Sequence, residues 1–132
     1  MKPWITVLAV ALALGAFGSL GKHVAAASNG AQIYTTNCSS CHGAEGKGLG
    51  SAFPPLAGNA DVNGPAKGII HTVKYGLHGS ISVNGQSFNG TMPPWSTTLS
   101  NADIAAVVTY IRSSWGNKGS AVTTSQVAAV KQ

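Results

Sequence analysis

The sequence is poor in the residues from which most catalytic and nucleic-acid-binding sites are built. Its 132 residues include only two cysteines, four histidines and three acidic residues. There is no run of basic residues and no set of aromatic residues interleaved with lysine or arginine, so binding to nucleic acid is not expected. There is also no second cysteine pair, which excludes a zinc site of four cysteines. No internal repeat or linker divides the chain, and its length predicts one domain.

The two cysteines stand in one motif with a histidine directly behind them. Cys38, Cys41 and His42 form the pattern C-x-x-C-H, which is typical of covalent haem attachment. On one helical turn both sulfurs point the same way, so both can bond the vinyl groups of a porphyrin while the imidazole lies over the iron. The alternatives are a redox dithiol, a structural disulfide or half of a zinc site. A zinc site would need two later histidines, and a thioredoxin-like dithiol would need a βαβ setting, which the surrounding sequence lacks.

The N-terminus has the features of an export signal. A short, weakly basic start precedes an apolar run over residues 5–20 and three alanines at positions 25–27. We expect a signal peptide over residues 1–27, cleaved after Ala27, and a single domain over residues 28–132. The apolar run is shorter than the roughly 20 residues that cross a bilayer, so the mature protein is not expected to span a membrane. The expected location is the periplasm or another exported compartment, with an uncleaved leader acting as an anchor as the alternative.

Export would also reduce the charge of the protein. The net charge of +5 falls to +3 without Lys2 and Lys22, because six basic and three acidic residues remain. The few remaining lysines are candidates for contact with an acidic partner.

Apolar spacing and capping residues predict three main helices. The first begins at Asn29, with Gln32 as the partner of a capping box, and runs to about residue 39. The second follows Asn63 and buries a stripe of isoleucine, valine and leucine side chains before it ends at Gly79. The third begins at Ser100 and ends at residue 116, and a short terminal helix is possible over residues 124–130.

A hairpin is predicted between the second and third helices. Asn84 and Gly85 lie between two short alternating runs, so the hairpin spans residues 81–88. The expected fold is therefore all-α, with three main helices around one haem and this short hairpin.

A second axial ligand would determine whether the haem carries electrons or reacts. Met92 is the only methionine beyond the expected leader, and its loop is stiffened by Pro93 and Pro94. It can be an iron ligand or a core residue that fills a gap. A His/Met pair fills both axial positions and favours electron transfer. His71 and His78, predicted on one face of the second helix, are the rival ligands, whereas His23 would leave with the leader.

In these features the chain resembles the class I cytochromes c, which are single-haem, all-helical electron carriers with His/Met iron. The resemblance covers residues 29–116 and rests on the motif at residues 38–42, Pro54-Pro55-Leu56, and Met92-Pro93 before a final aromatic-bearing helix. More narrowly, the chain is similar to the cytochrome modules of bacterial alcohol dehydrogenases and copper nitrite reductases.

The resemblance implies a role for each matching residue. Cys38 and Cys41 would form the thioethers, while His42 and Met92 would ligate the iron. The Pro54 carbonyl would accept a hydrogen bond from the His42 ring.

The resemblance also implies a crossing of the first and last helices at Gly30 and Tyr34, with Val107 and Tyr110 as partners. Trp95, close to Met92 in the sequence, is a candidate for contact with a haem propionate.

The expected function is one-electron transfer between proteins, with no enzymatic turnover. The donor would be a dehydrogenase or a cytochrome complex, and the acceptor an oxidase or reductase, each bound through apolar contact near the cysteine motif. The alternatives are a dedicated subunit of a dehydrogenase, reductase or oxidase, and a haem sensor or peroxidase in which Met92 is displaced.

Overall fold

The computed structural model describes the backbone of residues 21–132 and the side chains from residue 29 onward. The elements of this part of the chain, in order, are α1 (Gly21–Asn37), α2 (Ser39–His42), α3 (Ala60–Asn63), α4 (Ala66–Tyr75), β1 (Leu77–Val83), β2 (Gln86–Met92), α5 (Asn101–Ser113) and α6 (Thr124–Ala129). The apolar run expected to serve as a leader, residues 5–20, lies outside the described residues. No helix from residue 21 onward is long and apolar enough to cross a membrane.

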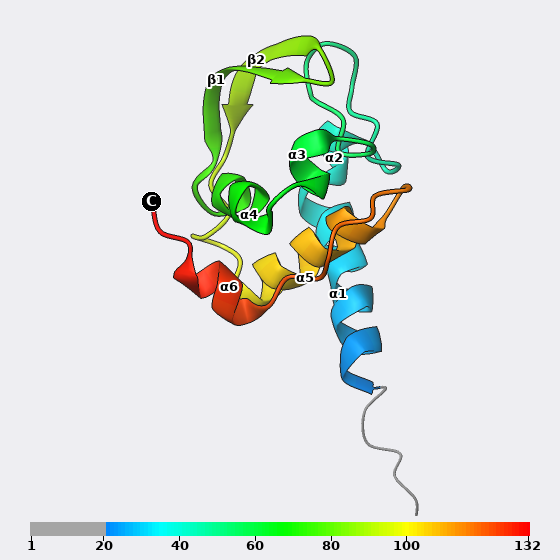
Figure 1. Ribbon diagram of the computed structural model, residues 1–132, viewed down its shortest axis with the longest axis vertical. Helices are drawn as coiled ribbons and strands as arrows, with labels where there is room; N and C mark the ends of the chain where they lie inside the picture. The colour runs from blue at the N-terminus through cyan, green and yellow to red at the C-terminus, as the bar shows by residue number, and fades with distance from the viewer. Residues whose placement is uncertain (1–20) are drawn as a thin grey trace, which may run out of the picture.

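The crossing of α1 and α5 organises the molecule (Figure 1). Gly30 lies directly against the carbonyl of Ala106, where a Cβ atom would collide with it. One turn further along α1, the rings of Tyr34 and Tyr110 are 5.6 Å apart. The predicted crossing is confirmed, with Ala106 rather than the adjacent Val107 in closest contact with Gly30.

The start of the first helix was predicted wrongly. α1 begins at Gly21, so Asn29 lies inside the helix and forms no capping box with Gln32. The reason is the run of alanines before Asn29, which has a high helix propensity and lets the helix continue through this position. The expected cleavage point after Ala27 therefore lies within α1.

The second predicted helix begins as expected, after Asn63, but ends earlier. A short α3 that was not predicted precedes α4, and α4 ends before Gly76, whose φ of 78° and ψ of −176° suit only glycine. Leu77 and His78 therefore belong to β1, and His78 does not share a helix face with His71. The predicted isoleucine and valine stripe of α4 is buried as expected.

The hairpin is longer than predicted but turns where expected. Asn84 and Gly85 have φ values of 51° and 81°, which a two-residue turn of type I′ requires. The strands pair from Val83 and Gln86 as far as Leu77 and Met92. The parts of the strands farthest from the turn contain glycine and serine. An alternation of apolar and polar residues is therefore not recognisable there, and the predicted hairpin was too short. The fold is thus helical with one two-stranded antiparallel sheet in the described residues.

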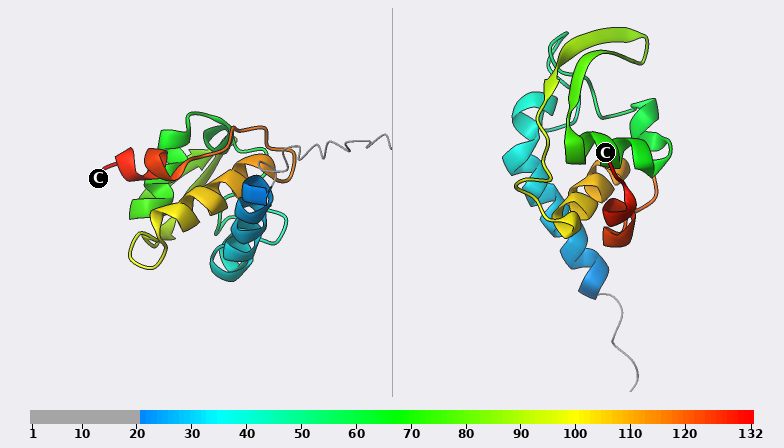
Figure 2. Two further views of the ribbon diagram at one scale, coloured as in Figure 1. Left: turned by 90° about the horizontal axis from the view of Figure 1, so that it is seen from below. Right: turned by 90° about the vertical axis from the view of Figure 1, so that its left-hand side faces the viewer.

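The last two helices, α5 and α6, begin where the sequence predicted. Ser100 and Asp103 form a capping box at the start of α5, and Thr123 and Gln126 form a second one at α6. Figures 1 and 2 show α6 lying beside α5 and α4.

Two buried cations bind this terminal segment to the rest of the protein. Lys74 donates hydrogen bonds to the carbonyls of Val127 and Val130, at 2.8 and 2.7 Å. Arg112 donates to three further backbone carbonyls, those of Ser120, Val62 and Gly64. Hydrogen bonds of charged groups are stronger than neutral ones, which offsets part of the cost of burying each charge. Neither role was predicted from the sequence.

Replacing Gly30 by alanine should destabilise the protein although alanine is the better helix former. The new methyl group would collide with the Ala106 carbonyl, and overpacking of this kind lowers the free energy of unfolding by about 1–3 kcal/mol. Gly68→Ala in α4 is the matched control, because its Cβ would enter open space and should add up to about 1 kcal/mol. Thermal unfolding of both variants measures the difference, and equal effects would contradict a close crossing at Gly30.

Candidate haem site

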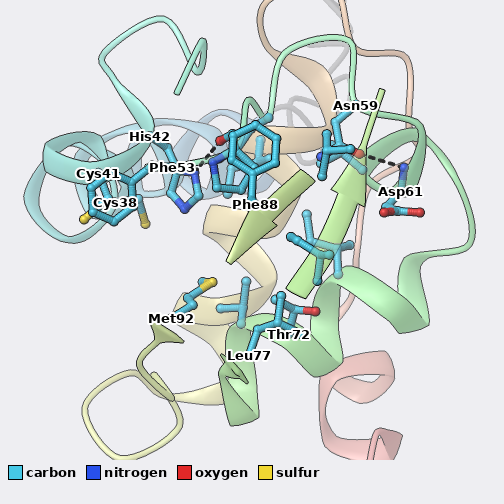
Figure 3. Close-up of a pocket in the computed structure, with 18 of the residues that line it drawn as sticks. Cys38, Cys41, His42, Phe53, Asn59, Asp61, Thr72, Leu77, Phe88 and Met92 are labelled. Carbon is cyan, nitrogen blue, oxygen red and sulfur yellow. Dashed lines mark hydrogen bonds between the residues drawn. The ribbon is translucent and has the colours of Figure 1, made fainter. Parts of the chain in front are cut away.

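A large cavity lies between α2, α4, the β1–β2 hairpin and the loops that join them (Figure 3). Its volume is about 530 Å³, within the range of about 300–1,000 Å³ that is usual for cofactor sites. Most of its wall is apolar, with Leu77, Phe88 and Ile111 among the contributors. The residues that the sequence singled out, Cys38, Cys41, His42, Pro54 and Met92, all line it.

The two cysteines lie at the junction of α1 and α2. Cys38 caps α2 and Cys41 is in its single turn, and both side chains are half-buried and free of a disulfide. Burial, and to a smaller extent the neighbouring Cys41, raises the pKa of the Cys38 thiol to about 11. A thiol of this kind is protonated at neutral pH, unlike the reactive thiolate of a redox dithiol.

His42 is held in one orientation by the backbone opposite it. Its side chain is 8% exposed, and its Nδ1 atom lies 2.9 Å from the Pro54 carbonyl oxygen. A carbonyl only accepts, so Nδ1 carries the proton and Nε2 keeps its lone pair. Burial lowers the pKa of His42 and the Pro54 contact partly opposes this, so the ring is neutral and suited to bind a metal.

The loop that follows His42 is fixed by two aromatic residues, Tyr34 of α1 and Trp115 just after α5. The Tyr34 hydroxyl donates to the Gly43 carbonyl at 2.6 Å, and burial, with a smaller contribution from Cys38, raises the pKa of Tyr34 so that it remains a donor. The Trp115 ring lies 4.9 Å from that of Tyr34 and covers Gly46 so closely that a Cβ atom there would collide with it.

Met92 approaches the cavity from the other side. It is the last residue of β2, and Figure 3 shows its sulfur facing the space below His42. The loop after it is held against the end of α4, because the Trp95 and Ser96 amides donate to the Val73 and Lys74 carbonyls. Gly76 completes this contact, since its missing side chain leaves room for the Met92 carbonyl.

The rival ligands are not part of the cavity wall. Neither His71 nor His78 lines it. The His71 ring instead packs at a tilt against the ring of Tyr75, with the ring centroids 5.0 Å apart. Trp95, the candidate for a propionate contact, does line the cavity. No group of three or more potential metal ligands among histidine, cysteine, aspartate and glutamate occurs in the described part of the chain.

Comparison with known proteins identifies the family. The cytochrome c family model matches residues 27–115. The chain belongs to the cytochrome c family. Its cofactor is therefore covalently bound haem c with its iron, and its general activity is electron transfer. The donor set of the cavity fits this group, because two thiols, an imidazole and a thioether meet a mostly apolar wall.

The relatives of this cytochrome include free-standing proteins and modules of larger ones. Cytochrome c-552 of Thermus thermophilus is 40% identical over 79% of this chain and 72% of its own length. Cytochrome c6 of Anabaena variabilis is 35% identical over 63% of this chain and 85% of its own. The cytochrome c subunit of the quinone alcohol dehydrogenase of Komagataeibacter europaeus is 40% identical over 67% of this chain, which spans only 19% of that subunit. The predicted resemblance to class I cytochromes and alcohol dehydrogenase modules is confirmed.

Sequence analysis missed a polar residue behind the proline loop. Asn117 is buried and binds the backbone of the loop that contains Pro54. An isolated asparagine after a helix carries no motif, so its partners become visible only in the folded structure.

Substituting Gly76 by alanine should release the Met92 loop from α4. The glycine-only backbone and the collision with the Met92 carbonyl should together cost about 2–4 kcal/mol of unfolding free energy. Gly50→Ala is the control, because it also has a positive φ but open space around it, and it should cost about 1–2 kcal/mol. Hydrogen exchange of the Trp95 amide should accelerate only in the Gly76 variant, and protection in both would contradict this role.

Proposed function

We propose that the protein is an exported one-electron carrier whose haem iron is bound by His42 and Met92. Cys38 and Cys41 would form the thioethers, and the Pro54 carbonyl would accept the hydrogen bond of the proximal ring. The bound haem supplies the redox chemistry, since its iron takes up and releases one electron. The observation that carries this proposal is the placement of a neutral imidazole and a thioether on facing sides of one cavity, next to both thiols.

Several features of the chain support a carrier over a reactive haem. Both axial positions would be filled, which favours electron transfer over reactions with oxygen or peroxide. The Met92 loop is fixed by backbone hydrogen bonds to α4 and by close packing on Gly76. The protein's own residues would position the haem, exclude water with the apolar wall and keep His42 in one tautomer. We therefore propose no enzymatic turnover.

The surface supports recognition with little contribution from charge. Two of the six basic residues beyond position 28, Lys74 and Arg112, are buried against carbonyls, and the exposed Lys47 pairs with Glu45. Only three other exposed cations remain beyond position 28, Lys67, Lys118 and Lys131. Partners would dock by apolar contact near the cysteines, as in weak redox encounters of small area.

We further propose cleavage of the leader after Ala27, which would leave one domain over residues 28–132 in the periplasm or an equivalent compartment. Donor and acceptor would be a dehydrogenase or cytochrome complex and an oxidase or reductase.

A role as a dedicated subunit is the second candidate. It is favoured by relatives that are subunits of larger assemblies, such as the cytochrome c subunit of gluconate 2-dehydrogenase from Pantoea cypripedii, 35% identical over 78% of this chain. The chain spans only 24% of that subunit. A stable complex in a pull-down from native membranes or periplasm would support this candidate over a diffusible carrier.

The visible spectrum tests the axial ligands. The purified protein should show a six-coordinate haem c when oxidised and reduced, and the reduced form should not bind carbon monoxide at neutral pH. Met92→Ala should bind carbon monoxide and have a lower potential, by an amount on the order of 0.1 V out of the ~0.8 V that axial ligands span. Ser96→Ala in the same loop should change neither property. Carbon monoxide binding by the wild type would support a sensor or peroxidase instead.

Covalent attachment can be tested on a denaturing gel. The double variant Cys38→Ala, Cys41→Ala should lose all haem under denaturing conditions, because no thioether can form. Ser39→Ala, Ser40→Ala changes the two intervening residues and should retain the haem stain fully. Haem that stays with the cysteine-free chain after denaturation would refute attachment at this motif.

A further inference from the structure

The turn after α5 contains a buried amide that binds the loop containing Pro54, which lines the cavity. Asn117 is 6% exposed, and all of its side-chain hydrogen-bonding groups are engaged. Its Oδ1 atom accepts from the Gly58 amide at 3.0 Å and from Asn63 Nδ2 at 2.9 Å. Its Nδ2 atom donates to the carbonyls of Leu56 at 3.0 Å and Ile111 at 2.8 Å.

These contacts attach the proline loop to the end of α5. The Leu56 and Gly58 contacts lie two and four residues after Pro54, whereas the Ile111 contact anchors the amide to the helix itself. Only a side chain with two donors and an acceptor can make this set, and asparagine is the smallest that provides them.

The same loop is held from its other side by the segment that follows His42. The Gly46 carbonyl accepts from the Leu56 amide at 2.7 Å and from the Ala57 amide at 2.9 Å. Trp115, two residues before Asn117, packs on Gly46. The turn after α5 therefore contacts both the segment that follows His42 and the proline loop that binds the His42 ring.

The two prolines connect the Asn117 contacts to the hydrogen bond of the His42 imidazole. Proline has a fixed φ and no amide hydrogen, so Pro54 and Pro55 form a stiff unit. A shift of Leu56 is therefore transmitted to the Pro54 carbonyl rather than absorbed by the chain between them. That carbonyl is the partner of His42 Nδ1 at 2.9 Å.

We propose that Asn117 is a positioning residue that sets the strength of the hydrogen bond between His42 and Pro54, and through it the reduction potential. The proposal rests on the function above, in which His42 ligates the haem iron. A strong hydrogen bond from Nδ1 makes the imidazole a better electron donor, which stabilises the ferric form and lowers the potential. Loss of the Asn117 contacts should lengthen this bond and raise the potential.

The test uses the haem-loaded full chain with two substitutions. Asn117→Leu keeps the branched arrangement of four side-chain heavy atoms and removes all four hydrogen bonds, and Asn117→Ser replaces the amide by a single hydroxyl. Neither adds a charge that would itself alter the potential. In both variants we expect a higher midpoint potential and, in the reduced protein, exchange of the His42 Nδ1 proton that is faster by about tenfold or more, as for loss of a buried hydrogen-bond network.

Thr109→Val is the matched control. It removes the hydrogen bonds of the Thr109 hydroxyl to the Val122 amide and carbonyl, at 2.9 and 3.3 Å, and so weakens a different attachment of α5. The control should lower the melting temperature but leave the potential and the proton exchange unchanged.

Each outcome decides the proposal. Asn117 variants that melt earlier but keep the wild-type potential and exchange rate would show a purely structural role and overturn the inference alone. If Asn117→Leu does not retain haem, Asn117→Ser decides by the same two measurements. A wild-type spectrum without His/Met ligation would overturn the proposed function, and the inference with it.

Discussion

The close crossing of α1 and α5 is the constraint on which the haem site depends. Because Gly30 has no side chain, the two helices touch at the Ala106 carbonyl. One or two turns later the aromatic rings of Tyr34, Tyr110 and Trp115 fill the space between them. Beyond these rings lie the cysteine motif at the end of α1 and the turn after α5. The crossing thus brings the turn after α5 beside the cysteine motif that lines the cavity.

Local signals in the sequence were enough to predict covalently bound haem as the cofactor and to predict the elements with strong caps. The capping box at Ser100, the Asn84-Gly85 turn and the buried stripe of α4 are all present as predicted. The cap, the turn and the stripe were predictable because each depends on residues within a few positions of one another. Cys38, Cys41, His42, Pro54 and Met92, singled out by the sequence, all line one cavity.

The errors and omissions concern effects that depend on more than a few neighbouring residues of the sequence. α1 extends through Asn29 because neighbouring alanines outweigh a potential cap, and α4 ends at Gly76 because the backbone must turn there to make room for the Met92 loop. Lys74 and Arg112 look like surface charges in the sequence but bind carbonyls that are distant in the chain. Such partners are defined only by the tertiary structure.

The contact between Asn117 and the proline loop has a consequence for the order of folding. The hydrogen bond to the Gly58 amide joins residues 59 positions apart, and contacts of such long sequence separation form late because a large loop must close first. The cysteine motif, in contrast, is complete within five consecutive residues. A chain that is still folding therefore presents its thiols for haem attachment before the turn after α5 arrives to fix the loop beside them.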